Sequence, residues 1–189
     1  DTGIRLRGEA VGSLTMLFLE MWHAMDDSPV RGLYNYLPRH WDYFPGEGYC
    51  IPYGDSPIDN NPVGEDVYLN MIESAEEYVY ITTPYLIITD EMSRALTNAA
   101  KRGVDVRIIL PGIPDKKMIY AISRSYYAQL LRAGVRIFEY SPGFLHSKQV
   151  LVDYRLAAVG TINFDYRSLY HHFENGVLIY ESPCIFDIA

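Results

Sequence analysis

Residues 144–168 read FLHSKQVLVDYRLAAVGTINFDYRS and predict the central element of the fold. Two apolar runs, at 149–152 and 156–159, are separated by the triplet Asp-Tyr-Arg at 153–155. Short apolar and β-branched runs on either side of a polar turn are typical of a β-hairpin. We therefore expect two short strands that meet at a turn, with polar residues converging at the strand ends.

Two residues of this stretch, His146 and Lys148, are expected to point the same way, because side chains alternate between the two faces of a strand. Asp153 is at an odd offset from His146, so we expect it on the opposite face, accepting hydrogen bonds that hold the hairpin. Taken alone, the His–Lys pair is explained most simply by an ordinary hairpin with an exposed lysine and a hydrogen-bonded histidine.

The residues around the hairpin have the chemistry needed to hold a phosphate. Histidine can form a covalent intermediate, and lysine neutralises phosphate charge as a point cation. Gly160 lets a backbone approach a ligand closely, while Thr161 and Asn163 supply neutral hydrogen-bonding groups. The pattern H-x-K-x4-D is expected by chance in roughly one per cent of chains this size, and the extension to G-T-x-N makes it rarer by about two orders of magnitude.

This pattern, carried by His146, Lys148, Asp153, Gly160 and Asn163, resembles one copy of the HKD motif of the phospholipase D superfamily. Further segments are similar to bacterial cardiolipin synthases of that superfamily: residues 163–168 and 173–175, which resemble the second copy of the motif, and residues 83–85, 103–107, 143–146 and 1–22. The resemblance covers nearly the whole chain and implies the C-terminal half of a two-motif enzyme.

The same resemblance implies a domain organisation. Residues 1–25 would be a strand–helix remnant of a missing first half, residues 26–48 a linker or loop, and residues 49–189 the second phospholipase D-like domain, truncated at its C-terminus. The partner motif would come from an upstream half or from a second copy of the chain. The remaining histidines have no lysine two positions on: His23, His40, His171 and His172.

The activity implied by the resemblance is phosphatidyl transfer, in which two phosphatidylglycerols give cardiolipin and glycerol through a phosphohistidine. His146, Lys148, Asp153 and Glu174 would be the catalytic residues, and Glu174 would orient the His146 ring. The phosphate would be held by Asn163, Gly160 and Thr161, with Tyr85 lining the site at a strand end. The scheme needs no metal and no cofactor. The alternatives are a phospholipase D-type hydrolase, a synthase that uses another alcohol, a nuclease, and a non-catalytic lipid-binding half.

The charge, cysteine content and hydrophobicity of the chain limit the kinds of partner that we expect. A net charge of −8 argues against a nucleic-acid surface and gives no general attraction to anionic lipid. Cys50 and Cys184 have no metal-binding spacing and indicate a reducing compartment. The apolar stretch at 14–25 is too short to span a bilayer. The resemblance to bacterial cardiolipin synthases implies a phospholipid substrate and a membrane surface as partners, with the membrane anchor outside this chain. Together with the reducing compartment, it leads us to expect the cytoplasmic face.

The hydrophobic pattern predicts an α/β fold with a mixed β-sheet flanked by helices on both faces, and the resemblance implies that this sheet is phospholipase D-like. Expected strands are 2–7, 49–53, 78–82, 104–110, 135–140, the hairpin at 147–160, and 176–180. Expected helices are 11–25, 63–75, 92–99 and 115–130. Twice a helix is followed by glycine and a β-branched strand, which indicates a largely parallel arrangement.

Three further clusters have two interpretations each. His171–His172 is a metal ligand pair or, more simply, a solvated loop pair. Arg167 and Ser168 either contact phosphate or have a structural role, which we favour. A basic cluster on the helix expected at 115–130 could contact a lipid headgroup, although we favour the simpler interpretation of an ordinary solvated helix face: Lys116, Lys117 and Arg124.

Overall fold

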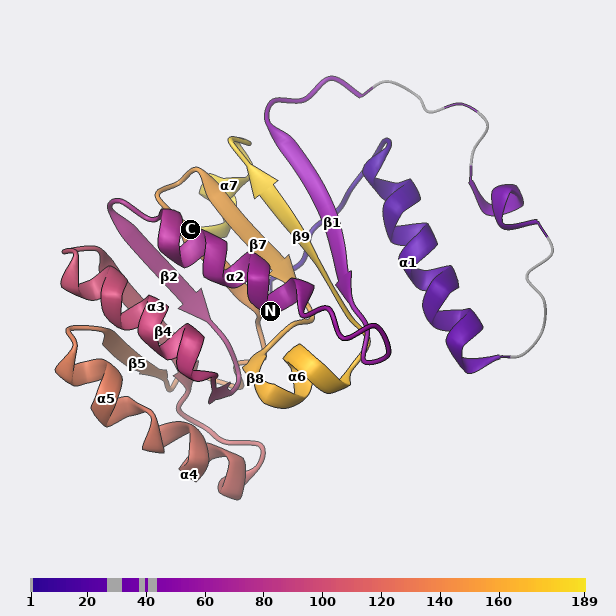
Figure 1. The fold of residues 1–189 in the computed structure, drawn as a ribbon. Coiled ribbons are helices and arrows are strands. Elements are labelled where there is room, and N and C mark those ends of the chain that lie inside the picture. Colours follow the sequence, from indigo (N-terminus) through magenta and orange to yellow (C-terminus); the bar gives the residue numbers. More distant parts are fainter. Residues whose placement is uncertain (1, 27–31, 38–39, 41–43) are drawn as a thin grey trace.

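The structure is a computed structural model that describes residues 2–26, 32–37, 40 and 44–189 (Figure 1). Along the chain the elements are α1 (Ala10–Met25), the 3-10 helix η1 (Leu33–Tyr36), β1 (Tyr49–Asp55), α2 (Val63–Ser74), β2 (Tyr78–Thr82), β3 (Leu86–Ile87), α3 (Asp90–Lys101), β4 (Asp105–Pro111), α4 (Lys117–Ser125), α5 (Tyr127–Arg132), β5 (Arg136–Tyr140), β6 (Gln149–Val152), β7 (Leu156–Gly160), β8 (Phe164–Asp165), α6 (Tyr166–His171), β9 (Glu174–Tyr180) and α7 (Ile185–Ile188). The linker expected at 26–48 lies partly outside the described residues.

Seven strands form one mixed sheet in the order β1-β9-β7-β6-β2-β4-β5. β2, β4 and β5 are parallel neighbours, as the repeated helix–glycine–strand order predicts. The predicted hairpin is confirmed as β6 and β7, whose antiparallel pairing places Val152 opposite Leu156. β9 and β1 continue the antiparallel part, and the short strands β3 and β8 form a separate parallel pair.

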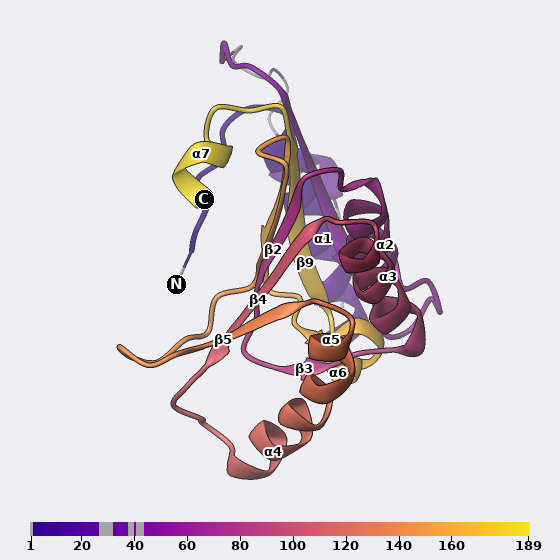
Figure 2. The same ribbon diagram turned by 90° about the vertical axis from the view of Figure 1, so that its left-hand side faces the viewer.

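Helices cover the two faces of the sheet unequally. In Figure 2, α2, α3 and α5 lie on one side of the sheet, and α7 with the N-terminal segment lies on the other. The larger core is on the first side, where α2, α3 and α5 pack on the sheet through Tyr68, Met71, Ile72, Met92, Leu96 and Leu130. Each fully buried aliphatic side chain contributes about 1.5–3 kcal/mol to stability. The expected mixed sheet with flanking helices is confirmed.

The strand expected at 2–7 is wrong. Its alternation is real, because Ile4 and Leu6 are half-buried between exposed neighbours. These two side chains pack on the smaller core of the second face, beside Leu151 and Ile179. The segment therefore lies across the sheet with its apolar side chains turned inward, and it is not assigned to any strand of the described sheets.

The other boundaries agree within a few residues, with two differences. The helix expected at 115–130 is two helices, α4 and α5, which meet at Tyr126. The sequence pattern also missed β3, β8 and α6, since strands of two residues and a six-residue helix are too short to show a period. No helix in the described part of the chain combines the length and the apolar character needed to cross a bilayer.

The fold brings one end of the hairpin to a shared sheet edge. β6 begins at Gln149, which pairs with Thr82 at the end of β2. β7 ends at Gly160, which pairs with Gly176 near the start of β9. The chain before β6, the chain after β7 and the first residue of β9 therefore meet at the edge where the parallel strand β2 ends, the usual place for a ligand in an α/β sheet.

Candidate active site

A cavity of about 440 Å³ opens at this edge of the sheet. Six of the eight predicted site residues line it: His146, Lys148, Gly160, Thr161, Asn163 and Glu174. Thr2 and Ser147 complete the lining. The structure therefore brings together in one cavity predicted site residues that span 28 positions of the chain, from His146 to Glu174.

His146 and Lys148 form a close pair. Lys148 Nζ lies 2.7 Å from His146 Nδ1 and donates to the His146 carbonyl oxygen at 2.6 Å. Both residues precede β6 and are outside any strand, so strand alternation is not what aligns them. The lysine side chain folds back over its own backbone, and this local hydrogen bond holds the two side chains on one side.

The pair fixes the expected tautomer of the histidine. An ammonium group has only donors, so Nδ1 must accept and the proton of the neutral ring is on Nε2. Burial lowers the pKa of His146, and the nearby Lys148 ammonium lowers it further. Burial also lowers the pKa of Lys148, against the opposing effect of the Glu174 and Asp165 carboxylates. His146 is therefore a neutral imidazole with a donor directed away from Lys148.

Two aromatic rings frame the His146 imidazole. The Phe144 ring stacks on it with a centroid separation of 5.7 Å and an interplanar angle of 14°. The Tyr85 ring meets it edge-on at 6.5 Å and 85°. The two contacts restrict the orientation of an imidazole that is otherwise exposed.

Glu174 does not orient His146 as the sequence resemblance implied. Its carboxylate accepts a hydrogen bond of 2.7 Å from the hydroxyl of Ser168, which is 1% exposed. That hydroxyl in turn accepts a 2.8 Å hydrogen bond from the Asn163 N–H. Glu174 Oε1 also lies 3.5 Å from His172 Nδ1. In the described part of the chain, the hydrogen bonds of Glu174 therefore secure the loop that carries Asn163. The structural role favoured for Ser168 is confirmed.

Asn163 presents an unusual polar group. Its side-chain oxygen Oδ1 is buried and has no hydrogen-bond partner among the described residues. A buried acceptor without a donor is costly, by about 1–3 kcal/mol, and calls for a ligand, a water or the opposite amide orientation. Because Asn163 lines the cavity, a donor on a ligand would meet the need of Oδ1, and a phosphate oxygen could accept from the side-chain N–H₂ group.

Gly160 and Thr161 contribute through their contacts with β9. A Cβ on Gly160 would lie 2.3 Å from the backbone oxygen of Asn175, so strand packing alone is enough to require a glycine here. The Thr161 hydroxyl accepts a 3.0 Å hydrogen bond from the Asn175 N–H. The two residues fix the spacing of β7 and β9 at the wall of the cavity, which differs from the close ligand approach expected at Gly160.

Asp153 lies at the opposite end of the hairpin from His146. Its carboxylate accepts hydrogen bonds of 2.8, 3.0 and 2.7 Å from the backbone N–H groups of Glu76, Glu77 and Tyr78, at the start of β2. The residue has a left-handed backbone with φ of 51°, which aspartate tolerates better than most residues. The expectation that Asp153 holds the hairpin is confirmed, and it is absent from the cavity lining despite being a letter of the motif.

Tyr85 lines a neighbouring cavity instead of the one around His146. Its hydroxyl donates to Asp115 at 2.5 Å. Burial raises its pKa to about 12, with the Asp115 hydrogen bond as the second cause. Tyr85 therefore reaches His146 through its ring and Asp115 through its hydroxyl. Asp115 follows 30 positions later in the chain, and no sequence signal linked the two.

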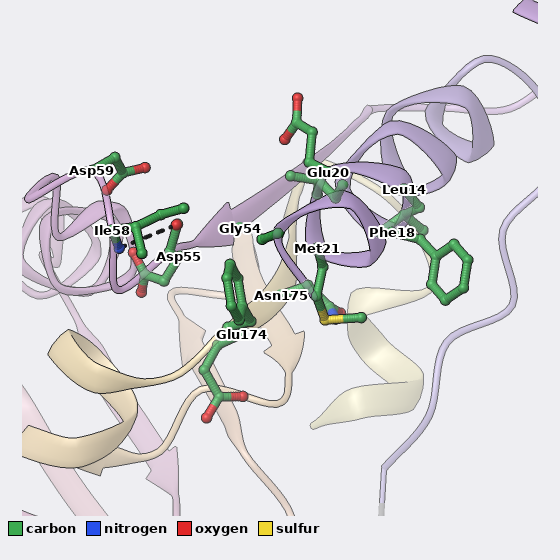
Figure 3. A pocket seen from close by; sticks show the side chains of 14 residues that line it. Leu14, Phe18, Glu20, Met21, Gly54, Asp55, Ile58, Asp59, Glu174 and Asn175 are labelled. Atoms are coloured by element: carbon green, nitrogen blue, oxygen red, sulfur yellow. Dashed lines mark hydrogen bonds between the residues drawn. The ribbon is translucent and has the colours of Figure 1, made fainter. Parts of the chain in front are cut away.

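A third cavity, of about 340 Å³, lies between α1 and the ends of β1 and β9. Figure 3 shows side chains of α1, among them Phe18 and Met21, around a space whose opposite wall carries Asp55 and Glu174. Asp55 is 6% exposed and accepts hydrogen bonds of 2.9 and 3.0 Å from the Gly64 N–H at the start of α2. Burial raises the pKa of Asp55 to about 6.

Sequence reasoning missed four residues of this region. Phe144 and Ser147 are close neighbours of His146 in the sequence, and this proximity could have indicated that they belong to the site. Thr2, whose hydroxyl lies 3.1 Å from that of Ser147, is 145 positions away and offered none. Asp115 is the fourth. No group of three or more His, Cys, Asp or Glu residues in the described part of the chain is placed to hold a metal ion.

Comparison with known proteins shows which family the chain belongs to. The family model described as "Cardiolipin synthase, PLD-like domain" matches residues 68–188. The chain belongs to this family. It is 41% identical over 191 residues to cardiolipin synthase 2 of Bacillus anthracis, covering 98% of this chain and 36% of that protein. It is 37% identical over 185 residues to the cardiolipin synthase of Alkalihalophilus pseudofirmus, covering 98% and 37%. The chain thus spans less than half the length of these relatives.

The fold of this cardiolipin synthase-type domain is also found among solved structures. The phospholipase D family member Nuc from Salmonella typhimurium superimposes with a TM-score of 0.63 at 22% identity, covering 75% of this chain and 89% of that chain. At this identity the likeness supports the fold, in agreement with the mixed sheet and the central hairpin described above.

Proposed function

We propose that this chain supplies one half of the active site of a cardiolipin synthase-like phosphatidyltransferase. The observation that carries the proposal is the convergence of His146, Lys148 and Asn163 on one cavity at the sheet edge. The family membership and the two relatives named as cardiolipin synthases support the substrate class, a phospholipid with phosphatidylglycerol as donor and acceptor.

The proposed reaction has two balanced steps. A histidine nitrogen attacks the phosphorus of phosphatidylglycerol, an N–P bond forms, and the P–O bond to glycerol breaks. A second histidine protonates the departing alkoxide, so free glycerol leaves. The hydroxyl of a second phosphatidylglycerol then loses its proton to that second histidine, its oxygen attacks phosphorus, and the N–P bond breaks. Lys148 and the Asn163 amide would hold the non-bridging oxygens as charge shifts.

The geometry favours the acid–base role for His146. Lys148 occupies Nδ1 of the resting neutral ring, so the proton is on Nε2 and that nitrogen has no free lone pair to attack phosphorus. As the acid, His146 would enter the reaction as the imidazolium, once Lys148 has left Nδ1, and would become the neutral base after giving its Nε2 proton to the leaving oxygen. An attacking imidazole would need an unprotonated Nε2 and an acceptor at Nδ1. The Glu174 carboxylate, which could have been that acceptor, is engaged by Ser168. We therefore propose that the phosphohistidine forms on the histidine of the partner motif.

The partner motif would come from an upstream half or from a second copy of this chain. Two histidines on opposite sides of one phosphorus are needed because the attacking and leaving oxygens lie roughly in line. We also propose that residues 1–25 belong structurally with that first half, that 26–48 link the halves, and that residues 49–189 are the second domain. In support, α1 packs on β1 but leaves apolar side chains exposed: Phe18, Met21, Trp22 and Met25.

We place the complete enzyme at a membrane surface, because its proposed substrates are membrane lipids, and we propose the cytoplasmic face. The test of the function is to incubate the complete two-motif protein with phosphatidylglycerol and identify the products. Cardiolipin with glycerol is the expected result. Phosphatidic acid as the only product would indicate a hydrolase. Absence of turnover would indicate a lipid-binding half. Either result would contradict the proposal.

A further inference from the structure

A second cavity, of about 660 Å³, adjoins the candidate active site. Asn163 lines both cavities, so the second begins where the first ends. Its walls come from the start of α4, from Tyr85 and Ile87 around β3, and from α6. The proposed reaction does not use this space, although it is larger than the cavity around His146 and within the usual size of ligand pockets.

The charge of the second cavity is positive, in a chain with a net charge of −8. Lys116, Lys117 and Arg167 line it, and none of the three forms an ion pair with another described residue. The one carboxylate in the lining, Asp165, accepts the Ser168 N–H as the N-terminal cap of α6. By contrast Arg124, on the same helix as Lys117, lies 3.5 Å from Glu139 and is outside the lining.

Apolar side chains share the cavity with these cations. Met118 is 75% exposed and Tyr166 is 51% exposed, and both line it together with Ile87 and Ile119. A cationic wall beside exposed apolar groups suits an amphipathic anion. The cavity is also electrostatically coupled to the active site, since the charge of Lys116 contributes to lowering the pKa of His146.

We propose that this cavity holds the phosphodiester of the acceptor phospholipid, and that Lys116, Lys117 and Arg167 determine the preference for an anionic lipid acceptor over a neutral alcohol. The inference rests on the proposed function. An acceptor phosphatidylglycerol carries its own phosphate one glycerol bridge away from the attacking hydroxyl. With the phosphorus under attack beside His146 and Lys148, that second phosphate must lie in an adjoining space, and this cavity is the adjoining space that carries unpaired cations.

The placement matches the acceptor step. The hydroxyl of the acceptor gives its proton to the acid–base histidine, forms the new P–O bond, and releases the histidine nitrogen of the partner motif. Asn163, at the junction of the cavities, has a buried acceptor oxygen with no partner among the described residues, and the attacking hydroxyl can donate to it before attack. The lysines and the arginine would hold the acceptor phosphate while its glycerol end enters the first cavity.

The test separates acceptor binding from every earlier step. The complete two-motif enzyme acts on phosphatidylglycerol in mixed micelles containing 1-butanol, and cardiolipin and phosphatidylbutanol are quantified together. Both products arise from the same donor intermediate, so their ratio reports the acceptor alone. The variants are Lys116→Gln/Lys117→Gln and Arg167→Gln, with Arg124→Gln as the control on the same surface.

We expect the ratio of cardiolipin to phosphatidylbutanol to fall by about tenfold in each cavity variant, because each loses charge-assisted contacts to phosphate. Phosphatidylbutanol formation should change much less than cardiolipin formation, because the charge of Lys116 affects this product only through the pKa of His146. Arg124→Gln should behave as wild type. Lys116→Arg/Lys117→Arg should restore the ratio.

A parallel fall of both products would place the donor lipid or the membrane contact in this cavity and overturn the inference. An unchanged ratio would show an ordinary solvated surface and overturn it too. If the wild-type enzyme formed neither product, the proposed function itself would fail, and the inference would fall with it for that separate reason.

Discussion

Lys148 Nζ lies 2.7 Å from Nδ1 of His146, the histidine two residues before it. The contact joins two chemical elements of a phosphate site, a cation and an imidazole, into a single unit. Since the ammonium can only donate, it sets the ring tautomer, and its charge lowers the pKa of the ring after the larger effect of burial. Lys148 therefore has two effects, one on the phosphate and one on the histidine.

Replacing Lys148 by methionine separates these two effects. Turnover by the complete enzyme should fall by about 100-fold or more, because one charged donor to the transferring phosphate is lost. The pKa of His146 should rise toward its ordinary value, because a neighbouring positive charge is removed. Product assays measure turnover, and NMR titration of the His146 ring measures its pKa. Lys101→Met, at the exposed end of α3, is the control and should change neither. An unchanged His146 pKa would contradict the electrostatic link.

The motif aspartate should behave differently from the motif histidine. His146→Ala should abolish turnover with little change in stability, since the ring is exposed. Asp153→Asn should lower the free energy of unfolding by about 1–3 kcal/mol, because one of its three backbone donors would then face an amide N–H₂. Asparagine tolerates the left-handed backbone at this position, so the change isolates the carboxylate. Turnover and urea unfolding are compared for both variants. Loss of turnover in Asp153→Asn without loss of stability would place the carboxylate in the chemistry.

How far the sequence predicts this domain is clear from the hairpin. Gln149–Val152 and Leu156–Gly160 were predictable because an apolar, turn, apolar pattern has few other solutions. The convergence of His146, Lys148 and Asn163 also followed from it. The reason given for this convergence, alternation of side chains along a strand, was wrong. His146 and Lys148 precede the strand, and a local hydrogen bond from Lys148 to the His146 backbone aligns them.

The contacts that sequence could not supply depend on side-chain positions. Glu174 begins β9, and whether its carboxylate meets His146 or Ser168 depends on the path of the loop at 161–168. Likewise the second cavity needs Lys116 and Arg167, which are 51 positions apart, to face one space. The alternation at 2–7 shows the opposite case, in which a correct period predicts buried side chains but not strand pairing.

Ser168 links the loop of Asn163 to Glu174, which leads to a third prediction. Ser168→Ala would leave the Asn163 N–H and the Glu174 carboxylate without this partner, so we expect a loss of about 1–3 kcal/mol of stability. Because Asn163 would lose its support, turnover should also fall beyond what the population of folded protein explains. Ser125→Ala is the matched control, since that serine is exposed and bonds only locally to the Ile122 carbonyl among the described contacts. A stability loss no larger than in Ser125→Ala would refute the linking role.

Asp55 gives a pH dependence with a definite sign. Its pKa is about 6 in the folded chain and 3.8 for the ordinary group, so the folded state binds more protons between these values. The stabilising contribution of protonated Asp55 is therefore present below about pH 4 and is lost as pH rises through 6, by about 2–3 kcal/mol in total. Asp55→Asn should remove this slope. Urea unfolding of both chains between about pH 4 and pH 7 measures it, and an identical slope in the two would contradict the assignment. The lowered pKa of His146 acts in the opposite direction, so the difference between the chains is the informative quantity.

The central claim is that this chain holds one half of a two-histidine site. Its most direct test is to assay phosphatidylglycerol turnover by the purified chain over a wide range of concentration, with and without a separately purified first half that carries the partner motif. We predict no turnover by the chain alone, or turnover that rises with the square of its concentration if two copies pair, and recovery when the first half is added. Turnover proportional to the first power of concentration, from a particle of monomer size, would show that one motif suffices and would contradict the account.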